Sequence, residues 1–338
     1  MTDPTRPAQH ALVTGAPGFL GSQITRQLVE AGVRVRALAM PGEPLDEIDG
    51  LDVEVVRGDV LDRSAMERAV ADVDTVFHAA AIYESWAPDP GPMYRVNLGG
   101  TFHVLEAARR AGVQKVVYTA SIVAVGRPLE GQVADERGPY RDWDLDFAYG
   151  RSKHLSMLVA QDFADWGLDV RIVCPGVVVG PGDRRPTPSG RLILGIAQGK
   201  TPGYADGGAS YVDVRDAAAG HLAAARFGEP GERYRVTDHN LSNQQLIDTV
   251  GRVAGRRRRA RRIPTALARS YITMLEKIAV RRGQRPDITR MFFDYGLREA
   301  FYDNAKARQE LKLDFRPFEE TVRDALEDFR RRGWLPAA

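Results

Sequence analysis

The feature that most constrains the fold of this chain is a short apolar run that leads directly into a glycine-rich turn. Residues 11–21 read ALVTGAPGFLG. Gly15 permits a tight turn, Gly18 lets main-chain N–H groups approach a pyrophosphate, and Gly21 lets a helix pack closely on the strand. Three glycines alone are weak evidence, but here they join a predicted strand to a predicted helix. The pattern therefore favours a dinucleotide site.

The first half of the chain alternates short apolar, β-rich runs with helical patterns. This alternation is typical of βαβ units, so we expect an α/β, Rossmann-type fold with a doubly wound parallel sheet. The predicted strands are Ala11–Thr14, Val33–Ala39, Val53–Val56, Thr75–His78, Lys115–Thr119 and Val170–Val173. The predicted helices are Leu20–Ala31, Met93–Ala111 and Phe147–Trp166.

The pattern loosens after residue 180, where a stretch rich in proline and glycine (180–190) is predicted to be loop. We expect residues 1–180 to form a dinucleotide-binding domain. Residues 181–338 are expected to form mainly a smaller α/β substrate-binding lobe, from which segments such as 210–235 return to the main sheet. Further helices are predicted at Asp213–Arg226, Asn243–Ala254 and Phe318–Arg332, with short strands near Tyr211 and Tyr234.

Composition narrows the class of protein. The net charge of +2 over 338 residues gives no general attraction to nucleic acid. Cys174 is the only cysteine, which excludes an internal disulfide and a cysteine-rich zinc site. The polar start MTDPTRPAQH has no signal-peptide pattern, and no apolar run is long enough to span a membrane. We expect a cytoplasmic enzyme that acts on a small molecule and has no nucleic-acid partner.

Tyr149 and Lys153 are four residues apart in a predicted helix, which places both on one helical face. An ammonium beside a phenol favours the phenolate, so we expect Lys153 to lower the pKa of Tyr149. A tyrosine tuned in this way exchanges the proton of a secondary alcohol while a hydride moves to or from a nicotinamide. Ser121, at the end of the predicted fifth strand, would bind the substrate oxygen; the alternative is a serine that caps the local loop.

Two further positions are candidates for cofactor contact. Asp59 follows the third predicted strand and would hydrogen-bond the adenine, although a turn or helix-cap aspartate is the simpler interpretation of the local sequence. The small residues Ala79–Ala81 end the fourth strand and would let a cofactor lie against the main chain, or would serve tight helix–sheet packing.

The order of these motifs resembles that of the extended short-chain dehydrogenase/reductases, over nearly the whole chain. The resemblance rests on the glycine loop, Asp59, the His-Ala-Ala run from residue 78, Asn97, and the Ser121, Tyr149 and Lys153 set. The chain looks most like the dihydroflavonol-reductase-like branch, which includes 3β-hydroxysteroid dehydrogenase-like proteins. Segments 86–97 and 180–191 are similar to bacterial hopanoid-associated sugar epimerases.

The resemblance implies the Rossmann-type fold, a nicotinamide cofactor, Ser/Tyr/Lys chemistry and a homodimer paired through helices 93–111 and 147–166. The expected cofactor contacts are Gly15, Pro17, Gly18, Phe19, Leu20, Gly21, Met40, Asp59, Val60, Ala79, Ala80, Ala81, Asn97, Tyr149, Lys153, Pro175, Val177 and Val178. The expected substrate contacts are Tyr83, Trp86, Ser121, Val123, Tyr149 and Pro188. The aromatics that flank the predicted cleft would either line an apolar substrate pocket or pack within their loops; they are Tyr83, Trp86, Tyr140, Trp143 and Phe147.

The chain departs from the patterns of several relatives. Met40 stands where many NADP-binding relatives carry an arginine, and no acid stands at residues 39–40, so NAD or NADP is expected with a slight preference for NAD. Arg36 and Arg57 are candidates to bind a phosphate, but strand alternation does not show that either side chain reaches it. Ile122 and Val123 replace the Asp-Glu pair of nucleotide-sugar dehydratases, and the arginine and aspartate typical of nucleotide-sugar enzymes are absent just before residue 210. These departures favour a simpler ketone or alcohol.

An arginine run at 256–262 precedes a segment whose apolar residues recur at helical spacing. One interpretation is a helix over the substrate cleft or at an anionic lipid surface, within residues 256–290. The favoured interpretation is a surface helix that packs its apolar stripe against the small lobe. The stripe consists of Leu267, Tyr271, Ile272, Leu275, Ile278 and Ala279.

The sequence therefore predicts an NAD(P)-dependent oxidoreductase for a secondary alcohol or ketone on a bulky lipophilic molecule, such as a steroid, terpenoid or flavonoid. Tyr149 would be the general acid/base, Lys153 would tune it and hold the ribose, and Ser121 would orient the substrate oxygen. A sugar epimerase that recycles a bound NAD is the alternative, and a non-catalytic cofactor sensor is a third. No metal site is expected, because His78 and His154 have no partner at metal-ligand spacing; both are interpreted as packing or solvent-facing residues.

Overall fold

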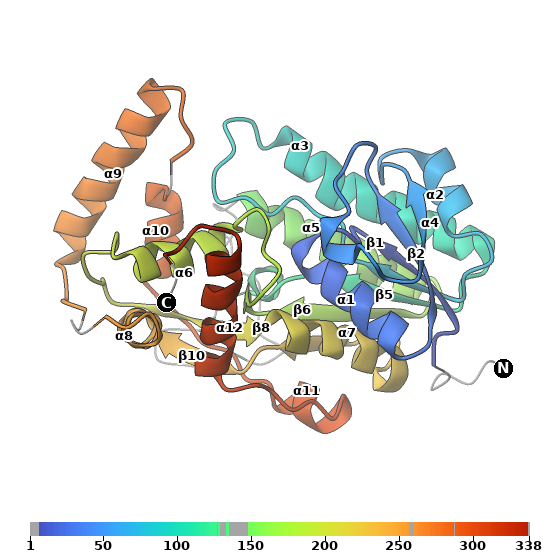
Figure 1. Ribbon diagram of the computed structural model, residues 1–338. Coiled ribbons are helices and arrows are strands. Elements are labelled where there is room, and N and C mark those ends of the chain that lie inside the picture. The colour runs from blue at the N-terminus through green and yellow to red at the C-terminus, as the bar shows by residue number, and fades with distance from the viewer. Residues whose placement is uncertain are drawn as a thin grey trace.

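A computed structural model describes residues 7–126, 128, 133–134, 148–256, 260–286 and 288–336. Its centre is a seven-stranded parallel sheet in the order β3-β2-β1-β4-β5-β6-β9, flanked by helices on both faces (Figure 1). The predicted Rossmann-type fold is confirmed. The strands of this sheet are β1 (His10–Thr14), β2 (Arg34–Ala39), β3 (Val53–Arg57), β4 (Thr75–His78), β5 (Lys115–Thr119), β6 (Val170–Pro175) and β9 (Arg233–Val236).

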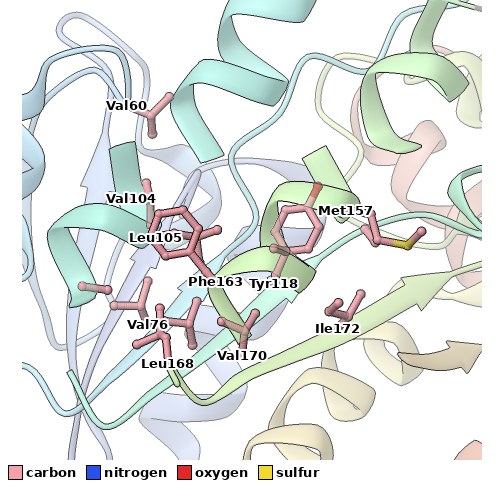
Figure 2. Packing of buried hydrophobic residues seen from close by; sticks show 14 of the residues in the cluster. Val60, Val76, Val104, Leu105, Tyr118, Met157, Phe163, Leu168, Val170 and Ile172 are labelled. Carbon is pink, nitrogen blue, oxygen red and sulfur yellow. The ribbon is translucent and has the colours of Figure 1, made fainter. Parts of the chain in front are cut away.

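One face of the sheet is covered by helices α2, α4 and α5, and the other by α1 and α7. Figure 2 shows the first of these layers, where Leu105 and Phe163 from the helices lie over Val170 of β6, and Met157 of α5 lies near Ile172. Strands β4, β5 and β6 are buried along their whole length because helices cover both faces of the sheet there. The helices are α1 (Phe19–Glu30), α2 (Arg63–Ala69), α3 (Gly91–Tyr94), α4 (Thr101–Ala111), α5 (Ala148–Asp165) and α7 (Val214–Phe227).

The predicted helix 93–111 is interrupted by a π-helical turn, η2 (Arg95–Gly100), between α3 and α4. Gly100 of this turn lies against Val60, and a Cβ at Gly100 would come within 2.6 Å of the valine side chain. Such turns insert one extra residue and are frequent at functional sites. The extra residue turns the side chains that follow it toward a different side of the helix.

A smaller sheet carries the second lobe. Strand β8 lies at its centre and pairs with β7, β10 and β11, whereas β9 joins the large sheet. Thus the segment 210–235 is divided between the two sheets. The elements of this part are β7 (Val177–Val179), α6 (Pro188–Gln198), β8 (Gly208–Asp213), β10 (His239–Ser242), α8 (Asn243–Val253), α9 (Thr265–Arg281), α10 (Arg290–Gly296), β11 (Glu299–Ala300), α11 (Ala305–Glu310) and α12 (Phe318–Arg331).

The predicted loop 180–190 is wrong in its last residues, because α6 already begins at Pro188. Thr187 is the N-cap: its Oγ1 accepts the N–H of Gly190 at 3.1 Å. Proline in the first turn lacks only an N–H that would have no helical partner, so it favours a helix start here. Buried Asp183 accepts hydrogen bonds from both the N–H and the hydroxyl of Thr187, and burial raises the pKa of Asp183 to about 6.

Helix α9 also differs from its favoured interpretation. It extends along the outer edge of the small lobe and packs on α10 (Figure 1). Of the predicted stripe, Ile272 is buried and Ala279 half-buried, but four members face outward. These exposed members are Leu267, Tyr271, Leu275 and Ile278. The small lobe therefore covers only part of the apolar stripe, and the rest of the stripe is exposed to solvent. Residues 257–259 of the arginine run lie outside the described residues.

Candidate active site

A cavity of about 600 Å³ opens at the carboxyl ends of the parallel strands. Its walls come from the residues that follow β1 to β6 on one side, and from α6, β8 and α10 of the small lobe on the other. The strand order reverses between β1 and β4, and ligands of open α/β sheets bind beside this switch point. The cavity is the candidate active site.

The glycine loop forms the floor of the nucleotide end. Gly15 has φ of +70°, and a Cβ there would lie 2.9 Å from the main chain of Ala80. A Cβ at Gly21 would lie 2.0 Å from the Gly15 oxygen. Gly18 is the N-cap of α1 and places no side chain over the first helical turn. A side chain at any of these positions would fill the cradle, so these residues fit a dinucleotide pyrophosphate.

The three candidate catalytic residues line this same cavity. Tyr149 and Lys153 are one turn apart in α5, and Ser121 follows β5. The Ser121 side chain forms no capping bond with its own short helical turn, which argues against the local-cap interpretation. Burial raises the pKa of Tyr149 to about 12, and a hydrogen bond with Ser121 partly opposes that rise. At neutral pH the phenol is therefore protonated.

The pKa of Tyr149 is raised rather than lowered, contrary to the effect of Lys153 that the sequence predicts. The Nζ of Lys153 donates a hydrogen bond of 2.6 Å to the main-chain oxygen of Thr119, and it lies 5.0 Å from the centre of the Tyr118 ring. Burial lowers the pKa of Lys153 to about 7, which weakens its positive charge at working pH. The expectation fails because desolvation dominates both groups, and side-chain spacing along a helix carries no information about burial.

A buried histidine behind the lysine was not predicted. Thr119 Oγ1 lies 2.9 Å from Nε2 of His221, on α7. The other ring nitrogen, Nδ1, lies 2.7 Å from the main-chain oxygen of Ala217, which only accepts. Nδ1 therefore carries the hydrogen, and Nε2 accepts from the Thr119 hydroxyl. Burial lowers the pKa of His221 to about 4, so the ring is neutral at working pH.

Asn97 joins the π-helical turn to α5 and to the strand-four loop. Its side-chain oxygen accepts the N–H of Ile82 (2.7 Å), and its side-chain nitrogen donates to the main-chain oxygen of Ile82 (3.1 Å). It also donates to Ser152 Oγ at 2.9 Å, and Ser152 in turn donates to the main-chain oxygen of Tyr149. Asn97 is buried and is not among the residues that line the cavity. It therefore fixes the start of α5, and so the position of Tyr149, from behind.

His78 is buried and hydrogen-bonded, which agrees with the packing interpretation of this residue rather than with the solvent-facing one. Its Nδ1 lies 2.7 Å from Thr14 Oγ1, and its Nε2 lies 3.0 Å from Thr101 Oγ1. Thr14 also accepts the N–H of Ala80, and Thr101 donates to the Asn97 oxygen. Burial lowers the pKa of His78 to about 3. His154 packs as predicted, with Nδ1 2.8 Å from the oxygen of Ala124.

The substrate end is walled by aromatic and aliphatic side chains. The Tyr83 ring lies 4.7 Å from the Tyr149 ring, between centres, at 45°. Leu192, Phe292 and Tyr295 from α6 and α10 complete this wall. The sequence did not single out these three because they lie 40 to 150 residues from Tyr149 and carry no motif.

Most of the residues predicted for the cofactor and substrate do line the cavity. Pro17, Trp86 and Asn97 do not, and Tyr140, Trp143 and Phe147 lie outside the described residues. The predicted residues that line it are Gly15, Gly18, Phe19, Leu20, Gly21, Met40, Asp59, Val60, Ala79, Ala80, Ala81, Tyr83, Ser121, Val123, Tyr149, Lys153, Pro175, Val177, Val178 and Pro188.

Comparison with known proteins agrees with this geometry. The sequence pattern of the family described as "NAD dependent epimerase/dehydratase family" matches residues 11–237. The chain belongs to this family. It is 34% identical to sterol demethylase protein B of Methylococcus capsulatus, over 96% of this chain and 99% of that protein. It is 29% identical to a 3 beta-hydroxysteroid dehydrogenase/Delta 5-->4-isomerase of Mycobacterium tuberculosis, over 89% of this chain and 84% of that protein.

The fold of the family is equally clear in three dimensions. The crystal structure of gox2253 superposes with a TM-score of 0.86 at 34% identity, over 97% of this chain and 99% of that chain. The predicted family is thus confirmed, and this chain is an oxidoreductase of the NAD-dependent epimerase/dehydratase family.

The end of β2, where members of such families select their dinucleotide, holds a residue that was not predicted. Residues 40–43 form a turn in which Gly42 has φ of +75°, and this turn brings Glu43 back beside Met40. The Glu43 carboxylate accepts the N–H of Met40 at 3.1 Å and lines the cavity. The Pro-Gly pair at 41–42 is the signal that could have predicted the turn.

The two arginines considered for a cofactor phosphate have other partners. Arg36 is buried, pairs with Glu54 at 3.1 Å and donates to main-chain oxygens after α2, so it cannot reach the cavity. Arg57 donates to the oxygens of Met40 and Glu43 and braces the turn from outside. Asp59 lines the cavity while one carboxylate oxygen accepts the N–H of Leu61 at 2.9 Å, so it has a turn role as well.

Two kinds of feature are absent from the described residues. No three of their histidine, cysteine, aspartate and glutamate side chains are grouped so as to hold a metal ion. In the same part of the chain, no helix combines the length and the apolar character needed to cross a membrane.

Proposed function

We propose that this protein is an NAD(P)-dependent dehydrogenase or reductase that acts on a secondary alcohol or ketone of a bulky lipophilic molecule. The observation that carries the proposal is one cavity that brings a dinucleotide cradle, the Ser121, Tyr149 and Lys153 set, and an apolar wall together. A bound nicotinamide would supply or accept the hydride. Side chains of the protein would transfer the proton and orient the substrate.

In the direction of reduction, the substrate carbonyl oxygen accepts a hydrogen bond from the Ser121 hydroxyl and the proton of Tyr149. The carbonyl carbon gains a hydride and its oxygen gains a proton, which yields the alcohol and leaves a phenolate that solvent reprotonates. A pKa of about 12 keeps Tyr149 protonated at neutral pH, so it is ready as a general acid. Oxidation uses the same groups in reverse and needs the phenolate.

The charges of the cavity support a lipophilic substrate. Among the described residues that line it, the charged side chains are Glu43, Asp59 and Lys153. Glu43 and Asp59 follow β2 and β3 at the nucleotide end, and Lys153 belongs to the catalytic set. No arginine or lysine of the described residues therefore lines the substrate end, where it could bind the diphosphate of a sugar nucleotide. That end offers instead the rings of Tyr83, Phe292 and Tyr295, which suit a hydrophobic ligand.

The names of two relatives point in the same direction. Sterol demethylase protein B and the 3 beta-hydroxysteroid dehydrogenase/isomerase are both named for steroid-like molecules. We therefore place steroid, terpenoid and flavonoid alcohols and ketones first among the substrates to be tested.

We propose NAD as the preferred cofactor, because Glu43 would repel the 2′-phosphate of NADP and would accept hydrogen bonds from ribose hydroxyls. We also propose a homodimer through α4 and α5. Phe102 on α4 and Trp166 just after α5 are both exposed, and both rings contact Phe163. This contiguous aromatic surface is of the kind that protein interfaces bury.

The experiment that tests the function follows nicotinamide absorbance while purified protein meets steroid, terpenoid, flavonoid and sugar-nucleotide substrates with NAD(H) and NADP(H) separately. A stoichiometric absorbance change with a lipophilic substrate, lost in Tyr149→Phe while cofactor binding is kept, is the expected result. Conversion of a sugar nucleotide to its epimer without net absorbance change would replace the proposal with an epimerase.

A further inference from the structure

Helix α9 has two faces with different surroundings. The face toward α10 holds buried Ile272 and half-buried Ala279, and is fixed by an ion pair between Arg269 and Asp294 (2.7 Å). The opposite face carries five large apolar side chains that recur every three to four residues, and they are 37–65% exposed. This outer stripe consists of Leu267, Tyr271, Met274, Leu275 and Ile278. A helix with this pattern has a second surface to bury.

The charges beside the outer stripe are positive. At 100° per residue, Lys277 and Arg281 lie along one side of the stripe, and Arg282 follows at its C-terminal end. None of the described residues forms an ion pair with these three cations. The acid of the helix, Glu276, lies on the other side, where its carboxylate accepts the N–H of Arg290 at 2.7 Å. The outer surface of α9 is thus apolar and cationic.

The outer stripe is connected to the candidate active site through α10. This helix packs on α9 and contributes Phe292 and Tyr295 to the cavity wall, while Met291 is exposed beside them. A second contact joins the C-terminal end of α9 to the cavity wall. Arg285, after α9, pairs with Glu84, which is next to Tyr83 in the sequence. A surface that received the outer stripe would lie next to the substrate end of the cavity.

We propose that α9 docks on an anionic lipid bilayer, with the outer stripe in the headgroup–acyl boundary and Lys277, Arg281 and Arg282 against the phosphates. Apolar side chains flanked by cations form the pattern of a helix that lies in a membrane interface. Charge complementarity favours this occupant over a second copy of the chain. In an antiparallel pair of α9 helices, Arg281 and Arg282 would lie beside the first turn of the other copy's helix, which has no acidic residue to pair with them.

The test measures the binding of the full protein to vesicles by cosedimentation, without substrate or cofactor, so that it is independent of the proposed function. Vesicles of phosphatidylcholine alone are compared with vesicles that also contain phosphatidylglycerol. We expect tight binding only to the second kind. Tyr271→Gln with Leu275→Gln is expected to weaken it at least about tenfold. Lys277→Gln with Arg281→Gln and Arg282→Gln is expected to weaken it about fivefold for each cation removed.

Matched controls separate docking from general effects. Val280→Gln changes an exposed apolar residue of the same helix on the side away from the outer stripe. Arg63→Gln with Arg226→Gln and Arg323→Gln removes the same charge from other exposed positions. Both controls are expected to bind as the wild type does. Circular dichroism and thermal unfolding of each variant show whether it is folded.

Three outcomes would overturn the proposal. One is wild-type protein that does not sediment with anionic vesicles. Another is binding that is equal in the stripe variant and the Val280→Gln control. The third is a lipid-free self-association, seen by sedimentation velocity, that the stripe variant abolishes, which would assign the outer stripe to a second copy of the chain.

Discussion

Lys153 and Thr119 are joined by a 2.6 Å hydrogen bond from the lysine Nζ to the main-chain oxygen of the threonine, and the hydroxyl of the same threonine donates to His221. The ammonium on α5, the end of β5 and the ring on α7 are therefore one connected unit. His221 is not among the described residues that line the cavity, and it acts as a positioning residue. Its effect on chemistry can only pass through Thr119 and Lys153.

We predict that Thr119→Val lowers kcat about tenfold with a smaller change in substrate KM. The substitution keeps the main-chain oxygen but leaves His221 Nε2 buried without its donor, which costs about 1–3 kcal/mol and shifts the strand end. Steady-state kinetics measure the effect. Thr119→Ser retains the hydroxyl and should restore most of the activity. Equal loss of kcat in the serine and valine variants would contradict this positioning role.

The pH dependence of the two reaction directions should differ. Burial raises the pKa of Tyr149 to about 12, so the phenol stays protonated through neutral pH and the phenolate fraction grows about tenfold per pH unit below that value. Alcohol oxidation needs the phenolate, so its kcat/KM should rise with pH between about 7 and 10. Ketone reduction needs the phenol and should show no such rise over that range. A flat oxidation profile would show that Tyr149 is not the base.

Glu43 should control the choice of cofactor. Glu43→Gln removes a negative charge at the end of β2 but keeps an oxygen that can accept the Met40 N–H. We expect the ratio of kcat/KM for NADP(H) to that for NAD(H) to rise about tenfold, because like-charge repulsion of the 2′-phosphate is lost. Asp46→Gln, a nearby exposed acid outside the cavity, is the control and should leave the ratio unchanged.

Replacement of Asn97 should lower the stability of the fold. Asn97→Ala removes its bonds to Ile82 and Ser152 and leaves the half-buried N–H of Ile82 without this partner, so we expect the free energy of unfolding to fall by about 1–3 kcal/mol. Thermal and urea unfolding measure this. Ser152→Ala removes one of these contacts and should cost less. Equal stability of the Asn97→Ala protein and the wild type would exclude the bracing role.

The aromatic surface on α4 and α5 should decide the oligomeric state. Trp166→Glu places a charge on a side chain that is 66% exposed in the single chain, so the fold should tolerate it while a dimer would not. We expect light scattering to give a dimer for the wild type and a monomer for this variant. Val55→Glu, at an exposed position on the edge strand β3, is the control and should leave the dimer intact.

Local patterns in the sequence were enough to predict the parallel sheet and the glycine loop. The strands at 10–14 and 115–119 have apolar central residues because both faces of the sheet are covered, and such runs are visible without any contact. The spacing of Gly15, Gly18 and Gly21 is likewise a local requirement of the turn. Tyr149 and Lys153 share a helical face by spacing alone.

Other features depended on contacts between distant segments. The protonation states of Tyr149 and Lys153 follow from desolvation, which no spacing reveals, and so the predicted effect of the lysine on the tyrosine was wrong. The outward face of α9 was misjudged for a related reason. Periodicity identifies an apolar stripe, but only the packed neighbours decide which part of it remains uncovered.

The sequence by itself determined the order of strands and helices, the dinucleotide cradle and the family, since each rests on residues close together in the chain. Only the tertiary structure decided that His221 supports Thr119 from 102 residues away, that Glu43 turns back to the cavity, and that Phe292 and Tyr295 close its substrate end. These relationships arise when separate elements pack around one core. Burial and partner contacts, which set charge and position, exist only in that packed state.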